Sequence, residues 1–156
     1  MTDEYLKTED FADLFDETLR RVANERSQEK RCVYKNILTD AIKRPQANDY
    51  DERLRFLRTL EGLQAAHIKV LRAIMYVPTD QERFGSGALS GAQIYTLEKR
   101  LPGIRPNTID DLISQLNGMG ITDLHNLKTM MSSGGAADLS DRLTRYGQRF
   151  VEFVKS

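Results

Sequence analysis

The chain has 156 residues, 40% hydrophobic and 29% charged, a composition that excludes a disordered or membrane protein and suits either one compact domain or a small domain plus a helical extension. Its 23 basic and 23 acidic side chains balance overall and nearly balance along the chain, so no segment has the basic excess typical of nucleic-acid binding. The single cysteine, Cys32, excludes an intramolecular disulfide, and no apolar run indicates a signal peptide or membrane span, so we predict a cytoplasmic protein.

Two apolar patterns with helical spacing dominate the N-terminal part. The first runs from Phe11 to Val22, and the second runs from Val33 to Ile42 after a polar interval at Asn24 to Arg31. Two interpretations fit this pattern: one long helix, or two helices with a hinge near Glu25–Gln28. The interval contains neither Gly nor Pro, which favours the single helix.

A small domain does not bury both patterns by itself, so we predict that this arm pairs with a second copy of the chain to form a dimer. The alternative is an arm that folds back on its own core. The candidate oligomerisation residues are Phe11, Leu14, Phe15, Leu19, Val22, Val33, Ile37 and Ile42.

A linker at Pro45 to Asp49 is predicted to separate this arm from two further helices. Asn48 or Asp49 is placed to cap a helix from Tyr50 to Glu61, which Gly62 ends, and a second helix spans Gln64 to Tyr76. Three arginines spread around the first of these helices, a pattern that favours a solvated surface over a phosphate site. They are Arg53, Arg55 and Arg58.

No residue pattern in the chain predicts catalysis, a metal or a cofactor. Neither His67 nor His125 has further metal ligands at the required spacing, or a nucleophile beside it. The glycines between Gly85 and Gly91 lack the Lys-Ser/Thr of a phosphate-binding loop, so we interpret this stretch as a connection. We therefore predict a protein that is not an enzyme.

The signals from Leu89 to Asn117 predict a helix-turn-helix. Ser90-Gly-Ala-Gln93 forms a capping box, and Leu89 with Ile94 forms a hydrophobic staple, so a helix begins here and continues to Leu101. After a short turn, Asn107 or Thr108 caps a second helix from 107 to 117. Packed on the helix from Gln64 to Tyr76, this pair would form a three-helix core with residues 107–117 as recognition helix.

The remaining residues predict a wing and a closing helix. Gly118-Met-Gly120-Ile121 turns the chain, and Leu124–Met131 and Leu139–Thr144 are the predicted strands on either side of a tip at Ser132–Ala137. A final helix starts beside Gly147. The predicted fold is mainly α: a long helix or helical hairpin over residues 1–47, then a winged helix-turn-helix over residues 48–156 with a small two-stranded wing.

Two resemblances accompany this prediction. Leu63-x-x-x-His67-Ile68-x-Val70-Leu71, Met119-Gly120-Ile121 and Leu143-Thr144-x-Tyr146-Gly147-x-x-Phe150-x-x-Phe153 resemble bacterial winged-helix domains. The run Glu25-Arg26-x-x-Glu29-Lys30-Arg31-x-x-Tyr34-x-Asn36-Ile37-Leu38 is similar to uncharacterised bacterial helical proteins, among them the abortive-infection alpha group. The first resemblance implies the fold of residues 63–156, and the second implies a phage-defence context. Neither implies a catalytic residue.

The outward face of the predicted recognition helix decides between two functions. Ser114, Gln115 and Asn117 can bind base edges, but Asp110 and Asp111 would repel DNA phosphates. This mixed charge favours docking of a partner protein, in a regulatory or defence role, with DNA binding by a transcriptional regulator as the alternative. The candidate docking or DNA surface comprises Arg105, Asn107, Thr108, Asp110, Asp111, Ser114, Gln115, Lys128, Arg142 and Arg145.

Overall fold

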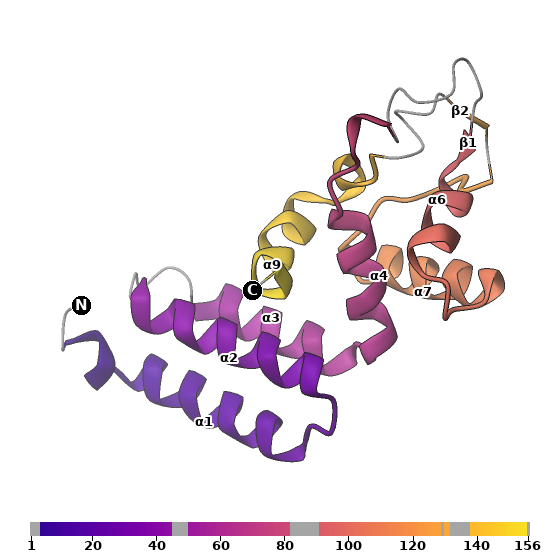
Figure 1. The fold of residues 1–156 in the computed structure, drawn as a ribbon. Coiled ribbons are helices and arrows are strands. Elements are labelled where there is room, and N and C mark those ends of the chain that lie inside the picture. Colours follow the sequence, from indigo (N-terminus) through magenta and orange to yellow (C-terminus); the bar gives the residue numbers. More distant parts are fainter. Residues whose placement is uncertain (1–3, 45–49, 82–90, 129, 132–137, 156) are drawn as a thin grey trace. The chain divides into compact units, whose positions relative to one another are not determined.

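The fold is that of a computed structural model (Figure 1), which describes residues 4–44, 50–81, 91–128, 130–131 and 138–155. The described residues are mainly α-helical, as predicted. The helices are η1 (Tyr5–Lys7), α1 (Glu9–Asn24), α2 (Gln28–Lys43), α3 (Tyr50–Gly62), α4 (Ala65–Met75), α6 (Gln93–Arg100), α7 (Pro106–Gly118), η3 (Ser140–Arg142) and α9 (Arg145–Lys155). The chain forms two compact units: unit 1 is Met1–Ala65 with Glu152–Ser156, and unit 2 is Ala66–Val151.

Unit 1 is built from α1, α2 and α3, which pack against one another. The side chain of Thr8 caps α1 by accepting a hydrogen bond from Phe11 N at 3.2 Å. Acidic residues occupy the first turn, where their negative charge interacts favourably with the positive end of the helix dipole. The end of α9 completes this unit: the Phe153 ring lies 5.2 Å from that of Phe56, and Phe153 O accepts a 2.7 Å hydrogen bond from Asn36 Nδ2. Its buried core includes Leu14, Val33, Tyr34, Ile37, Ala41, Phe56, Leu57 and Leu60.

The N-terminal arm consists of two helices, so the favoured single long helix is wrong and the helical hairpin is correct. The chain leaves helical geometry at Glu25 and α2 begins after Ser27, whose Oγ accepts a 3.3 Å hydrogen bond from Lys30 N. The Glu25 carboxylate accepts a 2.8 Å bond from Ser27 N, and Arg31 Nε donates a 2.5 Å bond to Glu25 O. Local polar side chains thus separate the helices without Gly or Pro.

Arg53 is buried in unit 1, so the prediction of a solvated surface is wrong for this arginine. Its side chain is 2% exposed and donates to Asp40 Oδ2 at 3.2 Å and to Arg44 O at 2.6 Å. Arg44 is the C-cap residue of α2. Arg53 therefore ties the end of α2 to α3, while Arg55 and Arg58 are exposed as predicted.

In unit 2, α4, α6 and α7 contribute a common set of buried side chains. Arg100 Nη1 on α6 donates a 2.9 Å bond to Ala73 O on α4, and α6 packs directly on α7. The core includes Ile68, Val70, Leu71, Ile74, Ile94, Leu97, Ile109, Leu112, Ile113, Leu116, Ile121, Leu124, Leu139, Phe150 and Val151. Most of these residues lie on helices at helical spacing, whereas Ile121, Leu124 and Leu139 come from the segments between α7 and η3.

The helix starts in unit 2 differ from the predicted ones. The N-cap of α6 is Ala92, which makes no side-chain cap bond, so the predicted Ser90 capping box is wrong; Leu89 and Ser90 lie outside the described residues. The N-cap of α7 is Arg105, with Pro106 in the first turn, so neither Asn107 nor Thr108 caps it. Proline is common at this position because the N–H that it lacks would have no hydrogen-bond partner within the helix.

The end of α7 and the start of α9 meet closely. Gly120 has φ +73°, and the bonds Ile121 N to Leu116 O (3.1 Å) and Gly120 N to Asn117 O (3.0 Å) close α7 in a Schellman motif. Thr144 Oγ1 donates to Gly120 O at 2.5 Å and accepts from Gly147 N at 2.9 Å. A Cβ at Gly147 would lie 1.8 Å from Ile121 O, so only glycine fits there.

The two-stranded wing predicted from Leu124–Met131 and Leu139–Thr144 is wrong. In the described residues, the strands are β1 (Gly91–Ala92) and β2 (Met130–Met131), which pair antiparallel, and the predicted return strand contains η3. A left-handed φ of 57° at Asn126 interrupts the first predicted strand. Thr122, just before the first predicted strand, forms an isolated antiparallel bridge with Leu143, which lies within the second predicted strand. The predicted tip at Ser132–Ala137 and the linker at Pro45–Asp49 lie outside the described residues.

Candidate functional site

On the outward face of α7, fewer side chains can contact a partner or DNA than the sequence suggests. Asn107, Thr108, Asp111 and Ser114 are exposed. Gln115 Oε1, however, lies 2.7 Å from His67 Nε2 on α4. The available face is therefore short, polar and, at Asp111, negatively charged.

The side chain of Asn117 forms hydrogen bonds within the chain and is not directed to a ligand. Its Oδ1 accepts bonds from Thr122 Oγ1 at 2.6 Å and Leu124 N at 3.0 Å, while its Nδ2 donates to Leu124 O at 2.8 Å. These bonds fold the segment after α7 back on the helix. Because all three involve its amide, Asn117 has little left with which to contact a base.

The predicted cations come from different elements. Lys128 Nζ lies 3.5 Å from Asp110 Oδ2. This ion pair neutralises the charge of both side chains. Arg105, Arg142 and Arg145 are exposed, but they belong to the start of α7, to η3 and to the start of α9 respectively. Together with the exposed Asp111, these residues give the candidate surface three exposed arginines, one exposed carboxylate and one ion pair.

The predicted oligomerisation residues divide into two groups. Leu14, Val33 and Ile37 are fully buried within unit 1, where they form its core, and Ile42 is half-buried. Phe15 and Leu19 are 39% and 48% exposed. They lie beside the half-buried Phe11 and Val22 at helical spacing. We refer to Phe11, Phe15, Leu19 and Val22 as the α1 stripe.

Charge is distributed asymmetrically along α1. Its acidic residues all precede its basic ones: Glu9, Asp10, Asp13, Asp16 and Glu17 come before Arg20 and Arg21. Hydrogen bonds from Arg21 and Arg20 hold the pKa of the Glu17 carboxyl below its usual value. The first half of the helix is therefore acidic, whereas the second half carries two arginines that both pair with Glu17, and the Arg21 side chain, 8% exposed, also pairs with Glu61.

A charged cluster in unit 1 surrounds the hairpin connection. Lys30 Nζ lies 2.9 Å from the Glu25 carboxylate and donates to Glu61 O at 3.3 Å. Burial acts to raise the pKa of Glu25, but hydrogen bonds from Lys30 and Ser27 outweigh it and lower the pKa. Burial, with the nearby Glu25 and Glu61, raises the pKa of the Tyr34 hydroxyl to about 12.

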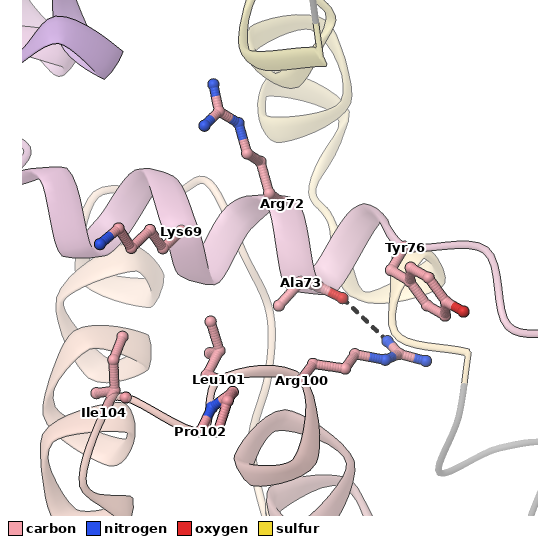
Figure 2. A pocket seen from close by; sticks show the side chains of 9 residues that line it. Lys69, Arg72, Ala73, Tyr76, Arg100, Leu101, Pro102 and Ile104 are labelled. Carbon is pink, nitrogen blue, oxygen red and sulfur yellow. Dashed lines mark hydrogen bonds between the residues drawn. The ribbon is translucent and has the colours of Figure 1, made fainter.

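Sequence reasoning missed an open pocket in unit 2, between α4 and the turn that joins α6 to α7 (Figure 2). We call it the α4–α6 pocket. Its volume is about 580 Å³, and its lining residues are Lys69, Arg72, Ala73, Tyr76, Arg100, Leu101, Pro102, Gly103 and Ile104. The only sequence signal was the pair Lys69 and Arg72, three residues apart on one helix.

Figure 2 shows how the side chains of the α4–α6 pocket lie. Lys69 and Ile104 are at one end, and Arg100 and Tyr76 are at the other, with Leu101 and Pro102 between them. The guanidinium carbon of Arg100 lies 4.6 Å from the centre of the Tyr76 ring, a cation–π contact. The guanidinium of Arg72 points away from the apolar side chains, so its stem rather than its charge lines the pocket.

Nowhere among the described residues do three His, Cys, Asp or Glu side chains gather where they could hold a metal ion. Of the helices the structure describes, none combines the length and the apolar character needed to cross a bilayer. Comparison with known protein families, curated proteins and solved structures finds no match to this chain.

Proposed function

We propose that this protein is a non-enzymatic interaction protein that pairs with a second copy of itself through the α1 stripe. The exposure of Phe15 and Leu19 carries this proposal, because large apolar side chains in contact with water favour association. Leu14 and Thr18 already hold α1 on its own unit. The stripe is therefore available without unfolding α1.

The charge distribution of α1 supports a second copy as the occupant. In an antiparallel pair related by a twofold axis, the acidic first half of each α1 faces the exposed Arg20 of the other. A parallel pair would place acid beside acid. A 16-residue helix is about 24 Å long, so the contact is small and we expect a Kd in the micromolar range.

Sedimentation equilibrium over a wide concentration range tests the pairing. We expect a monomer–dimer equilibrium in the full chain, and a Kd at least about tenfold higher in Leu19→Glu, because the contact would bury an unpaired charge. Tyr95→Ser is the matched control, since Tyr95 is a 60% exposed aromatic residue outside the stripe. A chain that stays monomeric at millimolar concentration, or a Leu19→Glu variant that pairs normally, would contradict the proposal.

A charge exchange tests the antiparallel direction. Asp16→Arg alone and Arg20→Asp alone each place like charges across an antiparallel contact, so both should weaken pairing. The double variant restores the opposite charges and should recover most of the affinity. Additive losses in the double variant would overturn the antiparallel arrangement while leaving pairing itself supported.

We propose further that the exposed face of α7 docks a partner protein. Asn107, Thr108 and Ser114 are exposed polar side chains, and Asp111 is negatively charged, so the face suits a partner with basic or hydrogen-bonding groups. A photo-crosslinking side chain at position 114 tests this in native cells, with position 99 on α6 as control. The partner captured must bind the purified chain and lose affinity on Asp111→Arg; otherwise the docking role fails.

Duplex DNA binding is the second candidate, favoured by the exposed Arg105, Arg142 and Arg145 of unit 2. Fluorescence anisotropy with a labelled duplex tests it at low and at physiological salt. The DNA-binding function predicts affinity that falls as salt rises and is lost when all three arginines become glutamate. No binding at low salt would remove this candidate.

A further inference from the structure

A small polar cavity lies in unit 1, beside the connection between α1 and α2. We call it the hairpin cavity. Its volume is about 190 Å³, below the range of about 300–1,000 Å³ that is typical of sites for drug-sized ligands, so it suits a smaller compound. Its lining comes from α1, α2, α3 and the α1–α2 connection: Arg20, Arg21, Asn24, Glu25, Lys30, Tyr34 and Glu61.

The Tyr34 hydroxyl is the feature that points to a ligand. Tyr34 is 1% exposed and lines the cavity, yet no group among the described residues forms a hydrogen bond with its hydroxyl. Buried hydroxyls are normally hydrogen-bonded, because burial without a partner costs free energy. Burial also raises the pKa of the Tyr34 hydroxyl, so this group keeps its proton at neutral pH and can donate a hydrogen bond.

The cations and carboxylates around the hairpin cavity compensate one another. Each of the cationic side chains in its lining pairs with a carboxylate: Arg20 with Glu17, Arg21 with Glu61 and Lys30 with Glu25, at N–O distances of 2.8, 3.2 and 2.9 Å. A ligand with a net charge would therefore meet repulsion as well as attraction. The charges of the lining favour a neutral compound.

The ion pairs leave hydrogen-bonding capacity for such a compound. Lys30 Nζ contacts the Glu25 carboxylate and donates to Glu61 O, which leaves one of its N–H groups without a partner among the described residues. A carboxylate can accept several hydrogen bonds, so Glu25 and Glu61 can accept more. The side chains of Arg21 and Lys30 are nearly buried and already held by their partners, so a ligand avoids most of the entropy cost of ordering them.

We propose that the hairpin cavity binds a small polyhydroxy compound, either a linear polyol or a single sugar ring. One hydroxyl of the ligand accepts a hydrogen bond from Tyr34, and its neighbours contact Lys30 and Glu25, since a hydroxyl group both donates and accepts. The cavity includes no residue of the α1 stripe, so this binding is separate from the proposed self-association.

An NMR titration of the isotope-labelled full chain with ribitol and with glucose tests the site, and saturable binding of either compound supports it. We expect shifts of the amide signals of the residues that line the cavity, with a Kd in the millimolar range for so small a ligand. Tyr34→Phe removes only the hydroxyl and should raise the Kd about three- to tenfold, the effect of one hydrogen bond. Asn24→Trp should also raise the Kd, because it adds bulk at an exposed residue of the lining.

Matched variants control for unspecific effects. Tyr95→Phe makes the same change at an exposed tyrosine outside the cavity, and Gln28→Trp replaces another exposed amide side chain outside it. Both should bind normally, and so should Leu19→Glu, which separates a failure of this site from a failure of pairing. The proposal is overturned by shifts that do not saturate, as expected of a solute that is only excluded from the protein surface. It is also overturned by equal effects of Tyr34→Phe and Tyr95→Phe, or by tighter binding of acetate or methylammonium than of both polyhydroxy probes.

Discussion

At the scale of single residues, the tightest constraint in unit 2 is the contact between Gly147 and the backbone of Ile121. The Ile121 carbonyl also accepts a 3.0 Å hydrogen bond from Thr144 N, so it cannot shift without breaking that bond. The sequence indicated that Gly120 and Gly147 matter, because they appear in the resemblance to winged-helix domains. It gave no reason for Gly147, since the reason is a close approach across residues far apart in the chain.

We expect Gly147→Ala to lower the free energy of unfolding by at least about 2 kcal/mol, because the added methyl group must displace a backbone carbonyl. Urea denaturation measures the change. Gly118→Ala is the control: a Cβ there meets no atom within 4 Å, so the free energy of unfolding should stay equal or rise slightly. Equal effects of the two variants would contradict the close approach.

Tyr34 makes the stability of unit 1 depend on alkaline pH. Its pKa in the folded state is about 12, against about 10 in the unfolded chain, so the folded state binds the hydroxyl proton more tightly. Its contribution to stability is therefore complete below pH 10 and is lost as the pH rises toward 12.

Urea denaturation at about pH 8 and about pH 11 tests this dependence. Between these values the wild type should lose on the order of 1 kcal/mol more than Tyr34→Phe, which has no hydroxyl to ionise. Tyr95→Phe, which changes a 60% exposed tyrosine, should behave as the wild type does. A Tyr34→Phe variant with the full alkaline loss would show that other groups cause it.

At the scale of elements, the helix interiors were predictable and several ends were not. Apolar spacing placed α1, α3, α4, α7 and α9 because each packs one face on a core. The break between α1 and α2 was missed because it depends on Ser27 and Arg31 binding nearby backbone rather than on Gly or Pro. The predicted wing failed because Asn126 takes a left-handed conformation and Asn117 holds the adjoining segment.

Ser27 should stabilise the start of α2. We expect Ser27→Ala to lower the free energy of unfolding by about 1 kcal/mol, because Lys30 N would lose the oxygen that caps it. Ser27→Asn keeps a capping oxygen and should cost much less. Chemical denaturation compares the variants, and an equal loss in both would mean that the cap itself contributes little.

At the scale of the whole molecule, the sequence indicated a helical protein with an apolar arm but not which apolar residues face water. Leu14 and Phe15 are neighbours in the same pattern, yet one is fully buried and the other is 39% exposed. Periodicity gives the side of a helix, whereas the packing of α2 and α3 decides how much of that side is covered. The α4–α6 pocket was missed for a related reason, since its cations come from α4 and from the distant end of α6.

Self-association predicts a melting temperature that depends on concentration. A partner copy that binds only the folded chain raises the Tm by about 1–3 °C for each tenfold increase above the Kd. Scanning calorimetry of the wild type over such a range should show this rise, and Leu19→Glu should show it only at concentrations at least about tenfold higher. A wild-type Tm independent of concentration would argue against pairing through α1.

The junction of Gly120, Thr144 and Gly147 also has an evolutionary consequence. A lineage that acquires any side chain at position 147 must first move the Ile121 carbonyl and so lose its bond to Thr144. The three residues should therefore persist together or disappear together as sequences diverge. Their spacing forms a short signature by which distant relatives could be recognised after the helix surfaces around it have changed beyond detection.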